Sequence, residues 1–126
     1  MNISATKQRI ASVWASGLAE HLKLVLETAI LNMRTGEEDA FEAAMLRARP
    51  LIAATPGFGG LNLHRCLEVP NRYFLMVKWR ALEDHTIGFR ESVRYEQWRD
   101  LLHHFYEPFP TVEHYGDAIM SGTETS

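Results

Sequence analysis

The feature that most restricts the fold is residues 22–33, where apolar side chains occupy both halves of an alternating pattern. One half contains Leu24, Leu26, Thr28 and Ile30, and the other contains Val25, Glu27, Ala29 and Leu31. This pattern predicts a strand, because side chains at alternate positions point to opposite faces of a sheet. Since both halves are largely apolar, the sheet that contains this strand should be covered on both faces.

The remaining patterns predict two helices and three further strands. An apolar stripe from Phe41 to Ile52 predicts a helix that starts at a capping box formed by Thr35 and Glu38 and is kinked by Pro50. After a glycine turn at residues 57–60, alternation predicts strands at 61–67 and 72–80. A second helical region is expected at about 83–106, broken near Ser92, and a short strand at 111–115.

This element order predicts an α+β fold of the ferredoxin-like βαββαβ type, with a four-stranded antiparallel sheet in residues 22–116. We expect an extra N-terminal helix in residues 1–21 and a flexible tail in residues 117–126. Two helices cover only one face of such a sheet. A second copy of the chain is therefore expected to cover the other apolar face, giving a homodimeric α+β barrel that encloses the reaction chamber.

Composition excludes several other classes of protein. The 126 residues suit one domain, and the net charge of −3 comes from mixed charges without a basic stripe, so nucleic acid is not an expected partner. The apolar runs are too short to span a bilayer and no signal peptide is recognisable, which predicts a cytoplasmic protein without membrane contact. The single cysteine, Cys66, is expected to be a buried strand residue.

Six stretches carry a resemblance to a known family: residues 26–31 (LETAIL), 35–41 (TGEEDAF), 54–58 (ATPGF), 73–79 (YFLMVKW), 82–86 (LEDHT) and 103–115 (HHFYEPFPTVEHY). They resemble the antibiotic biosynthesis monooxygenases, in which two ferredoxin-like subunits form a barrel with one pocket per subunit. The resemblance implies oxidation of a phenolic, anthrone-like substrate with no cofactor, molecular oxygen being the co-substrate. The family and its near relatives also include isomerases and haem-degrading oxygenases.

The haem-degrading branch is disfavoured by three positions. Members of that branch carry an asparagine, a tryptophan and an iron-binding histidine where this chain has Thr28, Phe89 and Arg99. Arginine carries only hydrogen-bond donors, so it cannot be an axial ligand of iron.

Three residues are candidates for the catalytic base that such chemistry requires. His85 is the leading candidate because a helix N-terminus would keep its ring neutral, although a capping role explains it equally well. His64 lies in an apolar strand, where it either reaches the pocket or packs against a helix. Glu27 lies inside an apolar strand and so must be paired, protonated or functional; Arg65 or Arg72 could pair with it.

A set of aromatic residues is expected to bind the substrate, or alternatively to form core: Trp79, Phe89, Tyr95, His103 and Tyr106. No metal site is predicted, because no two histidines have the HxH or HxxxH spacing. The preferred hypothesis is a cofactor-independent monooxygenase that acts on a small aromatic or enolisable molecule. A non-oxidative isomerase or lyase and a binding module without turnover remain as alternatives.

Overall fold

The computed structural model describes residues 24–122, so the helix predicted in residues 1–21 lies outside the described part. Within residues 24–122, the regular elements are four strands and two α-helices, together with a π-helical segment at Asp84–Phe89 and a 3₁₀ turn at His103–Phe105. The strands and helices are β1 (Val25–Asn32), α2 (Glu38–Ala53), β2 (Phe58–Arg65), β3 (Arg72–Trp79), α3 (Val93–Leu102) and β4 (Val112–Tyr115).

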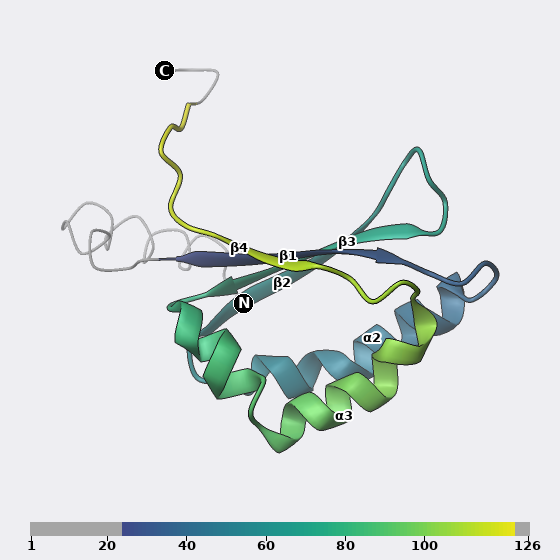
Figure 1. The fold of residues 1–126 in the computed structure, drawn as a ribbon, viewed down its shortest axis with the longest axis horizontal. Helices are drawn as coiled ribbons and strands as arrows, with labels where there is room; N and C mark the ends of the chain where they lie inside the picture. Colours follow the sequence, from purple (N-terminus) through teal and green to yellow (C-terminus); the bar gives the residue numbers. More distant parts are fainter. Residues whose placement is uncertain (1–23, 123–126) are drawn as a thin grey trace, which may run out of the picture.

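The four strands form one antiparallel sheet in the order β2-β3-β1-β4. Strand β1 is central, pairing with β3 on one side and with the edge strand β4 on the other. Both helices lie on the same side of this sheet (Figure 1). The predicted ferredoxin-like fold is therefore confirmed.

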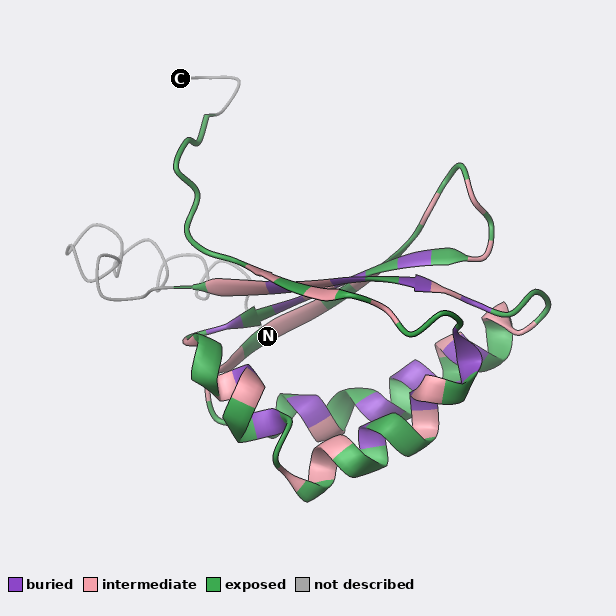
Figure 2. Cartoon of the chain, viewed as in Figure 1, coloured by how far each residue is buried: buried purple, intermediate pink, exposed green. Residues whose placement is uncertain are grey.

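The two faces of the sheet differ sharply in exposure. Ala29 and Leu31 in β1 are buried beneath the helices together with Leu75 and Val77 in β3. On the opposite face, which we call the open face, Ile30 is 52% exposed and its cross-strand partner Phe74 is 38% exposed. Figure 2 shows the same contrast on the helices, whose buried residues turn toward the sheet.

Helix α2 follows the predicted apolar stripe but not the predicted capping box. Its buried residues are Phe41, Ala44, Met45, Ala48 and Ile52. The helix begins at Glu38, and the carboxylate of Glu38 accepts the backbone N–H of Gly36 at 2.9 Å rather than that of Thr35. The predicted cap is therefore wrong, because the chain already turns at Gly36, where φ is +89°.

The break predicted near Ser92 is confirmed. The Ser92 hydroxyl accepts the N–H of Tyr95 at 3.3 Å, which caps α3, and donates to the carbonyl of Phe89 at 2.6 Å. The boundary of β2 was predicted wrongly: the strand begins at Phe58, and a bulge between Phe58 and Gly60 replaces the expected glycine turn. None of the helices in residues 24–122 is long and apolar enough to cross a membrane.

Candidate active site

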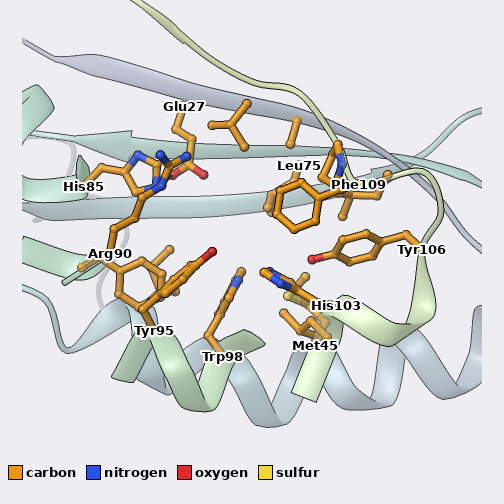
Figure 3. A pocket seen from close by; sticks show the side chains of 17 residues that line it. Glu27, Met45, Leu75, His85, Arg90, Tyr95, Trp98, His103, Tyr106 and Phe109 are labelled. Carbon is orange, nitrogen blue, oxygen red and sulfur yellow. Dashed lines mark ion pairs between the residues drawn. The ribbon is translucent and has the colours of Figure 1, made fainter. Parts of the chain in front are cut away.

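A cavity of about 210 Å³ lies between the helix-covered face of the sheet and the segment from the π-helix to β4. Its walls come from every layer of the fold, with Glu27 and Leu75 on the sheet and Trp98 on α3 (Figure 3). The cavity lies on the face that the helices cover, into which Glu27 points, and not on the opposite face that a second copy is expected to cover.

Glu27 is a buried carboxylate in the middle of the sheet. Its position in β1 directs the side chain to the helix-covered face, as for Ala29 two residues later. The indole Nε1 of Trp79 donates a 2.9 Å hydrogen bond to Oε1. Burial raises the pKa of Glu27 above its ordinary value, and this outweighs the lowering effects of the Trp79 bond and the Arg90 charge.

The predicted partners of Glu27 are wrong. Arg65 lies on β2 and pairs with Glu42, while Arg72 donates to the side-chain oxygen of Asn32 at 3.0 Å. Arg72 occupies an exposed position on the face opposite the helices, whereas Arg65 lies opposite Tyr73 at the end of β2 and meets Glu42 of α2 instead of Glu27.

His85 packs against this carboxylate. It is only 2% exposed, and its ring stacks on Trp79 with centroids 5.4 Å apart. Its Nε2 lies 3.3 Å from Oε1 of Glu27, and its Nδ1 lies 2.7 Å from Nε2 of His114. Burial lowers the pKa of His85 to about 3, helped by the positive charge of Arg90 and by His114, so the ring is neutral at neutral pH.

His114 and Arg90 complete the polar side of the cavity, and neither was predicted as a site residue. The β1–β4 register places His114 opposite Glu27. Burial and the charge of Arg90 lower the pKa of His114. The Arg90 side chain extends past His85 toward Glu27 (Figure 3). The alternating pattern of β4 could have revealed His114 only if its register with β1 had been known.

The opposite wall is aromatic with a few polar atoms. The Tyr95 hydroxyl, the Trp98 indole nitrogen, the His103 ring and the Tyr106 hydroxyl all point toward the centre of the cavity (Figure 3). Burial raises the pKa of Tyr106, so its hydroxyl keeps its proton and can donate a hydrogen bond. Burial lowers the pKa of His103, whose ring meets the edge of Phe109 at a centroid distance of 5.0 Å.

The structure brings most of the predicted site residues together. The cavity is lined by Glu27, His85, Phe89, Tyr95, His103 and Tyr106. Trp79 lies behind the cavity wall, fully buried between His85 and Phe58. His64 is not brought to the cavity, since it is exposed on the open face opposite Phe74. Within residues 24–122, no three histidine, cysteine or carboxylate side chains are arranged to hold a metal ion.

Comparison with known proteins agrees with this architecture. Residues 25–104 match the family model of the antibiotic biosynthesis monooxygenases. Over 95 residues, which are 75% of this chain and 100% of the relative, the sequence is 47% identical to the uncharacterized protein YczJ of Bacillus subtilis.

Two solved structures illustrate the range of structural similarity. A Bordetella bronchiseptica protein named for the same family superposes with a TM-score of 0.73 at 34% identity, covering 76% of this chain and 98% of that one. SnoaB, a cofactor-independent oxygenase from Streptomyces nogalater, gives 0.60 at 17% identity, covering 81% and 97%. SnoaB supports the fold alone, whereas the family model covers more than half of the chain. The chain therefore belongs to the antibiotic biosynthesis monooxygenase family.

Proposed function

We propose that the protein is a cofactor-independent monooxygenase that oxidises a small phenolic or enolisable compound with molecular oxygen. The observation that carries the proposal is Glu27, a buried carboxylate with a raised pKa at the wall of an aromatic cavity. A base of this kind is suited to remove a proton from a weakly acidic substrate. SnoaB, which shares the fold, is described as a cofactor-independent oxygenase, and the proposal assigns the same class of reaction to this chain.

Glu27 is a better candidate for the base than His85. Both ring nitrogens of His85 face protein groups, and its lowered pKa makes it a weak base. The contacts of Glu27 with Trp79 and His85 both involve Oε1. Among residues 24–122, Oε2 has no hydrogen-bond partner, so this oxygen can receive a proton from a molecule in the cavity.

The reaction needs no other redox group. Glu27 removes a proton from a substrate carbon that carries two hydrogens in its keto form. The carbanion transfers an electron to oxygen, and the radical pair recombines to a peroxide anion that takes a proton from water. Once Glu27 has released its first proton to solvent, it removes the second proton from the same carbon, which breaks the O–O bond and releases hydroxide. The two protons that Glu27 accepts in turn leave to solvent and neutralise the two hydroxide ions. The sum is CH₂ + O₂ → C=O + H₂O, so Glu27 ends unchanged.

The other cavity residues suit the anionic intermediate. Arg90 brings a positive charge next to Glu27, and the Tyr106 hydroxyl and the Trp98 indole offer neutral donors from the opposite wall. Donors placed around an oxyanion in a water-poor cavity stabilise it more than water does. A volume of about 210 Å³ is below the roughly 300 Å³ at which drug-sized pockets begin, which favours one small planar ring system.

Oxygen consumption with 1-naphthol and with anthrone tests the proposal. We expect uptake of one oxygen molecule per quinone formed, and a loss of about 100-fold or more in the Glu27→Gln variant. His104→Gln is the matched control, because this exposed histidine does not line the cavity. Deprotonation of either compound without oxygen uptake would support an isomerase or lyase instead. Binding without deprotonation would support a module without turnover.

We also propose that a second copy covers the open face of the sheet. Ile30 and Phe74 lie side by side there, and Leu24, which directly precedes β1, is also exposed. An apolar surface of this kind is costly to leave in water. Sedimentation velocity should give a dimer, and Ile30→Glu should give a monomer in which α2 and α3 remain folded. A wild-type monomer at micromolar concentration would contradict the proposal.

A further inference from the structure

Glu27, His85 and His114 form a continuous chain from the cavity to the edge of the sheet. Glu27 lines the cavity, His85 is buried, and His114 is half-buried on the edge strand β4. The two links of this chain measure 3.3 Å between Glu27 and His85 and 2.7 Å between the two histidines. The proposed function gives Glu27 the role of base but gives no role to His85 or His114. The two histidines therefore need a separate explanation.

We propose that His85 and His114 are a proton relay that exchanges the proton of Glu27 with solvent while the cavity is occupied. The inference rests on the proposed role of Glu27 as the base. It goes beyond that role because it assigns a path for the proton from the cavity to solvent and gives His114 a function.

The geometry allows two hydrogen-bonded states. With Glu27 ionised, His85 carries its proton on Nε2, next to the carboxylate, and its bare Nδ1 accepts from the Nε2–H of His114. With Glu27 protonated, the carboxyl donates to Nε2 of His85, whose Nδ1–H donates to Nε2 of His114. His114 then carries its proton on Nδ1. In each state, the two ring nitrogens that face each other are one donor and one acceptor. Both rings must therefore change tautomer together, because a ring held in one tautomer could not pair with both tautomers of the other.

Passage between the states moves one proton without leaving a charged ring. The carboxyl proton moves to Nε2 of His85, the Nδ1 proton of His85 moves to His114, and the outer proton of His114 leaves to water. Rotation of the carboxyl group turns a proton received on Oε2 toward His85. Because burial and Arg90 act against a positive charge on both rings, a concerted transfer through neutral imidazoles suits this environment.

Several features hold the relay in place. Trp79 stacks on the His85 ring and also donates to Glu27, which fixes the two relative to each other. The register of β4 on β1 sets His114 beside Glu27. The positive charge of Arg90 lowers the pKa of Glu27, His85 and His114. The 3.3 Å contact between His85 and Glu27 is at ion-pair distance but is not aligned as a hydrogen bond, and catalytic contacts are often loose in this way until the substrate binds.

The first test does not depend on activity. In protein labelled with ¹⁵N at histidine, we expect a scalar coupling across the bond between Nδ1 of His85 and Nε2 of His114. The coupling should vanish in His114→Gln and persist in the control His104→Gln, an exposed neighbour of the cavity wall. Absence of the coupling in the wild type would overturn the relay even if the protein oxidises its substrate.

The second test separates proton transfer from positioning. Glutamine at position 114 can still donate to His85 but cannot pass a proton onward. We expect turnover of His114→Gln to fall by about 100-fold at low buffer concentration and to recover with added imidazole. Wild-type turnover by His114→Gln at low buffer would show that His114 only positions His85. If the wild type shows no oxidation at all, the proposed function fails, and the coupling measurement alone decides the relay.

Discussion

Replacement of His85 by glutamine should change the pH dependence of stability in a defined direction. The folded-state pKa of His85 is lowered from 6.5 to about 3 by burial, so its contribution to stability is fully present above pH 6.5 and is lost as pH falls toward 3. At pH 5 the ring is protonated in the unfolded chain and neutral in the folded one. With about 1.4 kcal/mol per pH unit, the wild type loses about 2 kcal/mol through His85 between pH 7 and pH 5.

The destabilisation caused by His85→Gln should therefore shrink by about 2 kcal/mol between pH 7 and pH 5. Urea denaturation followed by tryptophan fluorescence measures it at both pH values. Phe89→Leu is the matched control, because this buried neighbour does not titrate and its effect should be the same at both pH values. An equal effect of His85→Gln at the two pH values would mean that folding does not suppress protonation of the ring, which would refute the reasoning.

Three further predictions concern individual residues. Phe41→Ala should cost about 3–5 kcal/mol because its ring is fully buried, whereas Leu46→Ala on the exposed side of α2 should cost under about 0.5 kcal/mol; equal shifts in urea midpoint would contradict this packing. Trp79→Phe removes the hydrogen-bond donor to Glu27, so the free energy of unfolding should fall by about 1–3 kcal/mol. Because this bond lowers the pKa of Glu27, the acid limb of the pH–rate profile should move to higher pH, and an unchanged profile would argue against the bond. Gly57→Ala should destabilise more than Gly36→Ala in thermal unfolding, because both have positive φ but only the new Cβ at position 57 would overlap the Asp84 carboxylate.

The fold could be predicted from sequence because its signals are local. The alternation in β1 and β3 and the apolar stripe on α2 each extend over eight residues or more. Such patterns identify the element even where the predicted end is wrong by a few residues. The start of β2 could not be predicted in the same way. Gly59 and Gly60 resemble a turn in sequence, and only pairing with β3 makes them part of a bulged strand.

The candidate site was only partly predictable, because it depends on register. A carboxylate within an apolar strand was enough to single out Glu27, since such a group needs a reason to be buried. Its true neighbours come from residues 79, 85 and 114, which no local pattern connects. His64 illustrates the reverse error, because its apolar neighbours in sequence lie on the other side of β2 from its own side chain.

The absorption spectrum of 1-naphthol bound in the absence of oxygen tests the central claim most directly, since that claim is proton transfer from a bound molecule to Glu27. The wild type should show the naphtholate band at neutral pH, well below the pH at which free 1-naphthol ionises, and Glu27→Gln should bind the neutral molecule. A neutral spectrum in the wild type, or an equally strong naphtholate band in Glu27→Gln, would contradict the account.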